Sequence, residues 1–536
     1  MFVFFYLFIT FSLIGYGYLF TKILNFNTLN YGFLGLVGIS FLTFISYASS
    51  LFLPHGYIFN SIVLFVGLVS FVFLNKSDIN SKNNLIKTLL IFLILVIFIY
   101  VKKNHDDFPY YHYPYSYLLT QIEHPLGLGQ LNNGFKNHSS LFFLSSIFYL
   151  PSISIYLLHI TPVFYLGFFN LIFIEFIKDK KIFSKFKFSN FFSLLAFSFV
   201  NIFFYRLAEH GTDRSGMIMI FIIILLIINL QNLRDFSKNN EIIFLLCILT
   251  SLLISIKTYY IIYLPLVLYF LIDTYKLRFF KILKTKVFFY CLVFTFFTIF
   301  FNFINSGCLI YPATITCFDN IAWSIDKVSI AKVNVWYELW AKSGANPNFV
   351  VTDREEYIAN FNWISNWIQN YFFNKVSDFL IGLGFLLILF FVFFRQKNQN
   401  KKKNKIHYKA LTIIFILYLL EWFLKHPALR YGGYHLIAIL SFIPLSIWFN
   451  NLSINFDIFY KKVIVILLIT ITVFFLRNFI RINNENDLYG KNSLLNYQYN
   501  FNENFFNRYV TEIENNKDKY EEINLLGKKV LIIKKN

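Results

Sequence analysis

The chain has 536 residues, of which 57% are hydrophobic and only 14% are charged, and its mean hydropathy is +0.57. Soluble globular proteins carry roughly 25% charged residues, so this composition excludes an ordinary soluble protein and indicates a polytopic membrane protein. The formal net charge of +20 does not indicate nucleic-acid binding, because Lys and Arg lie in short runs between apolar segments, as in cytoplasmic loops.

Fourteen apolar segments are long enough to cross the roughly 30 Å hydrocarbon core of a bilayer as helices. They are about 2-21, 32-53, 57-74, 85-101, 153-177, 188-206, 215-230, 242-257, 259-273, 286-305, 377-395, 407-424, 434-450 and 462-480. The first lacks the basic start and small-residue cleavage site of a signal peptide, so we expect it to remain as an anchor. The sequence therefore predicts an all-α polytopic transmembrane domain over 1-480, with long loops at 102-152 and 306-376, and a polar tail at 481-536.

The basic residues are distributed unequally between alternate connections, which predicts the orientation of the chain. One set of connections holds 25 Lys and Arg, and the short connections of the other set hold 5. The first set comprises 22-30, 75-87, 178-187, 231-239, 274-286, 395-409 and 451-462. Because cytoplasmic loops are enriched in Lys and Arg, this set is expected in the cytoplasm, and the loops 102-152 and 306-376 are then outside.

Five polar segments with unusual chemistry fall on the predicted outer side. They are "HDDFPYYHY", "YRLAEHGTDRSG" (205-216), "SIKTYY" (255-260), "SGCLIYPATITCF" (306-318) and "KHPALRYGGYH" (425-435). Their shared side suggests one joint site at the outer membrane surface.

The first of these segments brings two adjacent carboxylates, Asp106 and Asp107, to the end of a predicted span. Reduced solvation at a membrane surface makes a carboxylate more basic, so either could accept a proton from an attacking hydroxyl group. The alternative is a solvated acidic loop beside Lys102 and Lys103.

The same loop contains four histidines. They are His105, His112, His124 and His138. His105 and His112, which flank the carboxylates, are candidates for substrate binding. Imidazole and carboxylate suit zinc or manganese, but the spacings match no defined metal signature, so no metal ligands are assigned and the cofactor is unknown.

Four cationic residues lie at the predicted outer helix ends. They are Arg206, Arg214, Lys257 and Arg430. Arg and Lys bind phosphate through charge-assisted hydrogen bonds, and a charge inside an apolar run, as at Lys257, usually faces a cavity or a partner. The alternatives are snorkelling to the headgroup region or pairing with Glu209 and Asp213.

The 306-376 loop contains two cysteines and five tryptophans. Cys308 and Cys317 lie in an environment that would permit a disulfide. The tryptophans are Trp323, Trp336, Trp340, Trp363 and Trp367. Their spacing predicts interfacial helices whose aromatic side chains face lipid, with an acceptor groove as the alternative.

Four runs carry a resemblance to a known group of proteins. They are "HDDFPYYHYPYSYL", "GQLNNGFKNHSSLF", "SGCLIYPATITCF" and "HPALRYGGY". Together with the acidic pair and the basic helix ends, they resemble the GT-C superfamily of integral-membrane glycosyltransferases, and most closely a group of uncharacterised bacterial polytopic inner-membrane proteins. The chain departs from the superfamily pattern in two ways: three additional helices precede the span that delivers the acidic loop, and the two Asp residues are adjacent and not spaced.

The resemblance implies transfer of a sugar from a polyprenyl-phosphate donor to a glycan or lipid acceptor at the outer face of the bacterial inner membrane. It implies that Asp106 or Asp107 is the catalytic base, and that Arg206, Arg214, Lys257 or Arg430 binds the donor phosphate. Two other functions stay open: a polymerase or ligase of lipid-linked oligosaccharides, which would depend more on Arg430, and a flippase or transporter, for which no inverted repeat is visible.

Overall fold

The computed structural model describes most of the chain. The described residues are 1–25, 29–75, 81–100, 107–207, 211–232, 236–276, 279–346, 351–395, 408–489, 518, 520–525 and 527–533. Helices dominate these residues, and eleven of the helices are long and apolar enough to cross a membrane. The predicted fold class, an all-α polytopic membrane protein, is confirmed.

Each of the fourteen predicted spans contains a helix, but the predicted span 153-177 becomes the helix α7 only from Thr161. The chain divides into two compact units. The first unit comprises 1–172, 206–327 and 476–536, and the second comprises 173–205 and 328–475. The chain passes between the units within α7 (Thr161–Lys178), between residues 205 and 206, at the start of α15 (Lys327–Lys342) and within α21 (Phe456–Tyr489).

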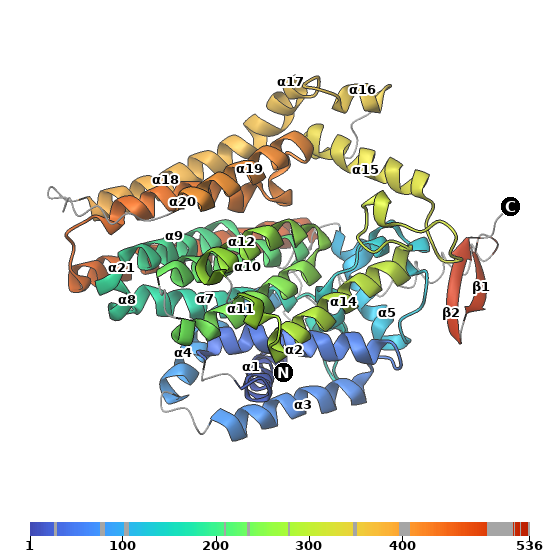
Figure 1. The fold of residues 1–536 in the computed structure, drawn as a ribbon, viewed down its shortest axis with the longest axis horizontal. Coiled ribbons are helices and arrows are strands. Elements are labelled where there is room, and N and C mark those ends of the chain that lie inside the picture. The colour runs from blue at the N-terminus through green and yellow to red at the C-terminus, as the bar shows by residue number, and fades with distance from the viewer. Residues whose placement is uncertain are drawn as a thin grey trace. The chain divides into compact units, whose positions relative to one another are not determined.

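The first unit contains most of the helices (Figure 1). They are α1 (Phe2–Ile23), α2 (Tyr31–Ser50), α3 (Tyr57–Leu74), α4 (Ser81–Ile94), η2 (Leu95–Tyr100), η3 (Phe108–His112), α5 (Tyr113–Gln121), η4 (Leu128–Gln130), η5 (Asn133–Lys136), α6 (Ser140–Ser146), η6 (Ile155–Leu157), α10 (Gly211–Asn232), α11 (Phe236–Ile256), η7 (Thr258–Tyr263), α12 (Leu264–Tyr275), α13 (Phe279–Ile282), α14 (Lys286–Ser306) and η9 (Thr314–Thr316).

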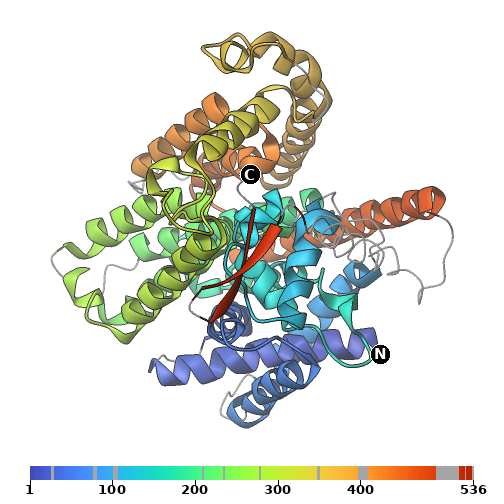
Figure 2. The same ribbon diagram turned by 90° about the vertical axis from the view of Figure 1, so that its right-hand side faces the viewer.

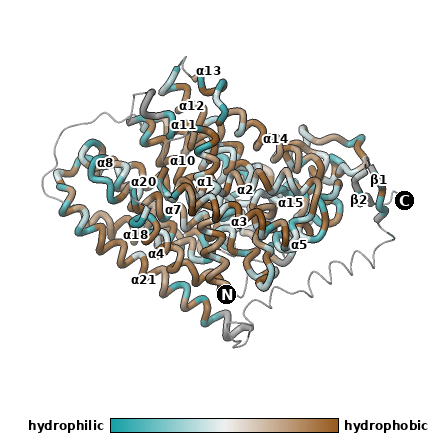
Figure 3. Tube along the Cα trace, turned by 90° about the horizontal axis from the view of Figure 1, so that it is seen from below, coloured by the Kyte–Doolittle hydropathy of each residue, from teal (hydrophilic) through white to brown (hydrophobic). Residues whose placement is uncertain are grey.

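Among the candidate membrane spans of the described residues, α10 is the most deeply buried. Its apolar window is 100% buried, whereas the windows of α3 and of Ser81–Tyr100 are only 28% buried. A helix that is apolar on all sides is expected either in a core or in lipid. Figure 3 shows the apolar colouring along α3 and α4, whose exposed apolar faces suit contact with hydrocarbon.

The first three helices pack through glycines that allow their backbones to touch. A Cβ atom on Gly15 of α1 would lie 1.8 Å from the carbonyl oxygen of Gly67 on α3, and one on Gly38 of α2 would lie 1.8 Å from the carbonyl oxygen of Leu13. Small residues at helix contacts are typical of membrane proteins, because close backbone approach increases van der Waals contact.

The second unit contains most of α21 and a further set of helices. They are α8 (Lys180–Lys185), α9 (Lys187–Phe203), most of α15, α16 (Arg354–Ile358), α17 (Ile364–Trp367), η10 (Ile368–Val376), α18 (Ser377–Phe394), α19 (Lys409–Lys425), η11 (Leu429–Tyr431) and α20 (Gly433–Asn450).

The expectation that the tryptophans of the 306-376 loop face lipid is wrong for two of them. Trp363 is 0% exposed and Trp367 is 5% exposed, and both rings pack against Phe423 of α19. The indole N–H of Trp367 donates to the carbonyl oxygen of Pro427 at 2.9 Å. Because each of these two rings packs on protein, both form part of a core. Trp336, by contrast, is 43% exposed.

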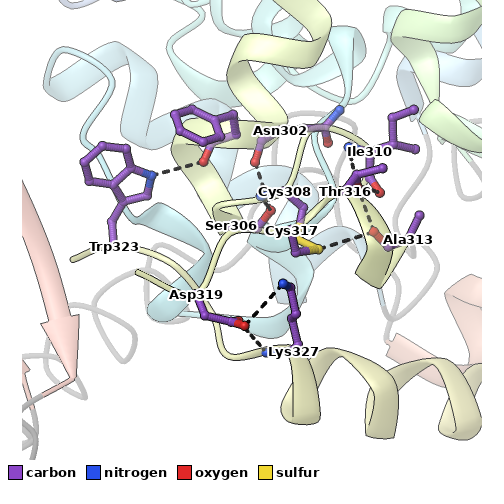
Figure 4. Close-up of a disulfide and its surroundings, with 11 residues drawn as sticks. Asn302, Ser306, Cys308, Ile310, Ala313, Thr316, Cys317, Asp319, Trp323 and Lys327 are labelled. Carbon is purple, nitrogen blue, oxygen red and sulfur yellow. Dashed lines mark hydrogen bonds and ion pairs between the residues drawn. A yellow bond between two sulfur atoms is a disulfide. The ribbon is translucent and has the colours of Figure 1, made fainter. Parts of the chain in front are cut away.

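The segment after α14 forms a closed loop in which Cys308 and Cys317 are disulfide-bonded (Figure 4). The helix ends at Gly307, whose φ of +79° is a conformation that glycine adopts readily. The backbone N–H of Phe318 donates to Gly307 at 3.0 Å, so the disulfide lies beside a short backbone ladder.

The C-terminal part of the chain ends in a two-stranded antiparallel hairpin of β1 (Tyr520–Leu525) and β2 (Lys528–Ile533), visible in Figure 2. Tyr520 pairs with Ile533 and Leu525 with Lys528. The predicted polar tail at 481-536 thus contains a pair of hydrogen-bonded strands.

Candidate functional site

A small polar pocket lies in the first unit, where the segment after the fourth predicted span meets the start of α10. Its lining includes His112, His159, Thr161, Gly211 and Thr212. The volume of this cavity is about 20 Å³, which exceeds the roughly 10–15 Å³ that one water molecule needs. The pocket is therefore large enough for a water or one small polar group in this conformation.

The acidic segment reaches the pocket through η3, a single π-helical turn. Asp107 immediately precedes this turn and makes no capping hydrogen bond to it, and Phe108 and His112 line the pocket. The hydroxyl group of Ser116 donates to the carbonyl oxygen of His112 at 2.9 Å, which holds the turn against α5. Single π-helical turns occur frequently at functional sites.

The opposite wall is the N-terminus of α10. A Cβ atom on Gly211 would lie 3.7 Å from Nδ1 of His112 and 3.6 Å from Pro162, so this helix start lies directly beside the imidazole. The first backbone N–H groups of a helix have no partner within the helix, and the helix dipole favours negative charge there. Asp213 occupies the first turn accordingly.

Lys257 lies next to this helix start and pairs with Asp213. Its Nζ atom lies 2.7 Å from Oδ1 of Asp213, and the side chains are 30% and 5% exposed, respectively. The hydroxyl group of Tyr260 donates to the backbone oxygen of Asp213 at 3.1 Å. The structure thus contains the ion pair with Asp213 that the sequence analysis gave as the alternative role of Lys257. This ion pair connects the residue before η7 to the first turn of α10.

His159 was missed by the sequence analysis because the segment 153-177 was assigned to one span. The helix α7 begins only at Thr161, since Ser152 and Ser154 have φ values of 69° and 46°, which an α-helix does not accept, and Pro162 suits a first helical turn. The signal that would have revealed this boundary is the Thr-Pro pair itself.

His159 is buried, and its Nε2 atom lies 3.1 Å from the carbonyl oxygen of Phe98. Burial, with a smaller contribution from the charge of Arg481, lowers the pKa of His159 to about 4. It is therefore neutral at pH 7 and contributes hydrogen bonding without charge.

The other predicted site residues are placed as follows. His105 and Asp106 lie outside the described residues. Arg206 is exposed, whereas Arg214 in the first turn of α10 is 7% exposed. Arg430 belongs to the second unit, where its guanidinium group lies 5.5 Å from the centre of the Trp340 ring. The structure thus brings His112 and the start of α10 together, and Lys257 to Asp213.

The remaining histidines of the acidic loop are held by hydroxyl groups. Nε2 of His124 lies 2.9 Å from the hydroxyl oxygen of Tyr115, and Nε2 of His138 lies 2.7 Å from that of Tyr47. Burial lowers the pKa of His138 well below its ordinary value. Within the described part of the chain, no group of three His, Cys, Asp or Glu residues is arranged to hold a metal ion.

The fold and this pocket define a multi-pass helical membrane protein with a polar site beside a buried helix start. The chain belongs to the family described as "Domain of unknown function (DUF8201)", whose model matches residues 1–437. No curated protein and no solved structure matches the chain. The matched region includes every residue that lines the pocket.

Proposed function

We propose that the protein is a membrane glycosyltransferase of the GT-C type, which transfers a sugar from a polyprenyl-phosphate donor to a glycan or lipid acceptor at the outer face of the inner membrane. The observation that carries this proposal is the pocket, where the segment that follows the carboxylates meets the N-terminus of α10. A helix N-terminus binds phosphate through its backbone N–H groups and its dipole.

In this mechanism Asp107, or Asp106 beside it, accepts the proton of the acceptor hydroxyl group as its oxygen attacks the anomeric carbon of the donor sugar. The bond between that carbon and the phosphate oxygen breaks, and polyprenyl phosphate leaves as an anion. Fixed positive charge and oriented N–H groups at such an anion often lower a barrier by several kcal/mol.

The start of α10 supplies these N–H groups, and Lys257 and Arg214 supply positive charge near it. An ammonium group has three donors, and the Lys257 side chain is 30% exposed, so Lys257 can pair with Asp213 and also approach a phosphate. His112, beside Gly211, is placed to hydrogen-bond to a phosphate oxygen, and neutral His159 orients the sugar or a water molecule.

The test uses the full-length protein in liposomes supplied with a radiolabelled polyprenyl-phosphate sugar and a membrane extract as acceptor. Asp106→Asn and Asp107→Asn are assayed separately, with Asp319→Asn as the control, because Asp319 is a half-exposed carboxylate paired with Lys327. We expect one of the first two variants to lose transfer by at least about 100-fold, as is typical for a general base, and the control to retain it.

Full transfer by both variants at positions 106 and 107 would show that neither carboxylate is the base. Movement of label across the membrane without any covalent product would favour a flippase or transporter. A larger loss in Arg430→Gln than in either Asp variant would favour the polymerase or ligase.

A further inference from the structure

The run "GQLNNGFKNHSSLF" begins with two short 3₁₀ turns of the first unit, η4 and η5. The side-chain amide of Asn132 donates to the carbonyl oxygen of Tyr110 at 3.0 Å. A Cβ atom on Gly134 would lie only 2.3 Å from the ring of Tyr111. The turn η5, which ends at Lys136, is therefore packed on η3, the turn that leads from the acidic segment into the pocket.

The other side of this segment packs on the C-terminal end of α14. The backbone N–H of Gly127 donates to the carbonyl oxygen of Ile304 at 2.7 Å. A Cβ atom on Gly129 would lie 2.5 Å from the carbonyl oxygen of Asn305 and 3.1 Å from Cγ of Lys136. Glycine at position 129 therefore leaves the space that the aliphatic part of the Lys136 side chain occupies beside η4.

Lys136 differs from the other buried lysine of the described residues, Lys342. Lys342 is 3% exposed, and its ammonium group pairs with Glu338 at 2.6 Å and donates to the carbonyl oxygen of Ile358 at 2.8 Å. Lys136 is 9% exposed, yet no described residue forms an ion pair or a hydrogen bond with its ammonium group. Asp326 lies near enough for its charge to act on Lys136 but does not pair with it.

An ammonium group without a partner is unfavourable at this degree of burial, because buried charges lose their hydration and are normally paired. Burial lowers the pKa of Lys136, and the charge of Asp326 offsets only part of this effect. Charged groups whose pKa is shifted in this way are frequent at binding and catalytic sites. The anion that would compensate the charge of Lys136 therefore has to come with a ligand.

We propose that Lys136 binds a phosphate group at a site bounded by η4, η5 and the segment that carries Asp326. Lysine suits phosphate because its ammonium group is a compact positive charge with three hydrogen-bond donors. The side-chain amide of Gln130 donates to the carbonyl oxygen of Ser324 at 3.5 Å, which connects η4 to the segment before Asp326. The site thus has walls from both outer loops of the first unit.

The position of this site explains why phosphate is the anion. The site lies beside the end of α14, a helix that is long and apolar enough to cross a membrane, and lipid phosphate groups gather at that level of a bilayer. A phosphorylated molecule in solution reaches the same level from the water side. The inference does not rest on the proposed function, because Lys136 and Gly129 are not among the residues that line the pocket beside α10.

The first measurement is the thermal midpoint of the full-length protein in micelles of an uncharged maltoside detergent, followed by tryptophan fluorescence. Lys136→Met removes the ammonium group and keeps the length of the side chain. Without added phosphate, we expect its midpoint to equal or exceed that of the wild type, because no uncompensated charge is left at position 136. Lys342→Met should lower the midpoint, since Glu338, which is 17% exposed, loses its partner. An equal decrease in both variants would show that Lys136 is structural and would overturn the proposal.

The second measurement is the rise of the midpoint as a phosphate compound is added, because a ligand that binds only the folded state stabilises it. The probes are inorganic phosphate, farnesyl phosphate and phosphatidylglycerol, with sodium chloride, farnesol and diacylglycerol as their references. We expect Lys136→Met to bind at least about tenfold more weakly than the wild type, as for the loss of one charged hydrogen bond. Lys327 is half exposed and pairs with Asp319 (Figure 4), so Lys327→Met is the matched control and should bind as the wild type does.

The three probes distinguish the source of the phosphate group. Stabilisation by phosphatidylglycerol alone, lost in Lys136→Met, would identify a lipid headgroup, whereas stabilisation by farnesyl phosphate or inorganic phosphate would identify a phosphate monoester or free phosphate. No stabilisation of the wild type, equal binding by Lys136→Met, or an equal loss in Lys327→Met would each overturn the proposal. Sugar transfer is not measured, so failure of this site and failure of the glycosyltransferase are separate results.

Discussion

The ion pair between Lys257 and Asp213 offers a sharp test of how the start of α10 is held. The two charges lie 2.7 Å apart, which corresponds to a gross attraction of about 6 kcal/mol at an effective dielectric constant of about 20. Desolvation of the carboxylate, which is only 5% exposed, offsets much of this. The substitution Lys257→Met keeps the length of the side chain and removes the charge.

Removing one partner of a fully buried pair costs about 3–5 kcal/mol, because the other charge stays buried and uncompensated. Lys257 is 30% exposed, so water partly replaces its ammonium group, and we expect Lys257→Met to lower the free energy of unfolding by about 2–3 kcal/mol. In the double variant Asp213→Asn/Lys257→Met neither charge of this pair is left without its partner, and at least ~1 kcal/mol of this loss should be recovered.

The measurement is unfolding of the purified protein in mixed detergent micelles, followed by tryptophan fluorescence as the denaturing detergent is increased. Lys327→Met is the matched control, since Lys327 pairs with Asp319 at 3.4 Å with both side chains about half exposed, and such surface pairs contribute at most ~1 kcal/mol. If Lys257→Met is no more destabilising than Lys327→Met, the buried pair does not hold α10 and the reasoning fails.

Three further predictions concern stability. Removing the disulfide should lower the free energy of unfolding by about 2–3 kcal/mol in the same detergent titration, because the bond closes a loop with a sequence separation of 9. The loss should be the same in Cys308→Ser, in Cys317→Ser and in the double variant, since each change breaks the same bond. A double variant much less stable than either single variant would contradict this. Gly15→Ala, whose Cβ would lie 1.8 Å from a backbone oxygen, should lower the thermal midpoint in detergent strongly, whereas Gly384→Ala, which meets nothing within 4 Å, should leave it unchanged; equal midpoints would refute the close backbone contact. The pKa of His159 is lowered to about 4 from 6.5, so between these pH values the unfolded chain binds a proton that the folded chain does not. The free energy of unfolding should therefore fall by up to about 3 kcal/mol as the pH decreases through this window. His159→Gln should flatten this part of the pH–stability profile, and an unchanged profile would show that His159 does not cause the slope.

Part of the candidate site could be predicted from the sequence. The segments that contain His112 and Gly211 were both singled out, and the structure places these two residues beside each other. The contribution of His159 was missed because hydropathy alone does not distinguish a helix from a short 3₁₀ turn of apolar residues; only the pair Thr161 and Pro162 marks the start of the helix in the sequence. The pairing of Lys257 with Asp213 was foreseen only as an alternative, since the choice of partner depends on how η7 lies against α10.

The tryptophans illustrate a similar limit. Trp363 and Trp367 have the spacing of an amphipathic helix, which the sequence analysis interpreted as a face toward lipid. In the structure this face packs on Phe423 of α19. An apolar stripe shows that one face of a helix must be shielded from water. Lipid and protein can both shield it, so the periodicity of the sequence does not distinguish a lipid-facing helix from one packed on protein.

The sequence by itself determined the class of the protein and the positions of its helices. Backbone groups in hydrocarbon have no partner outside their own helix, so a long apolar run has one stable structure, and each of the fourteen runs contains a helix in the structure. Tertiary structure alone decided which helix is buried, where the backbones of α1 and α3 touch, and that the π-helical turn at His112 meets the start of α10. These features depend on contacts between segments about 50 to 100 residues apart, and such contacts leave no periodic pattern in either segment.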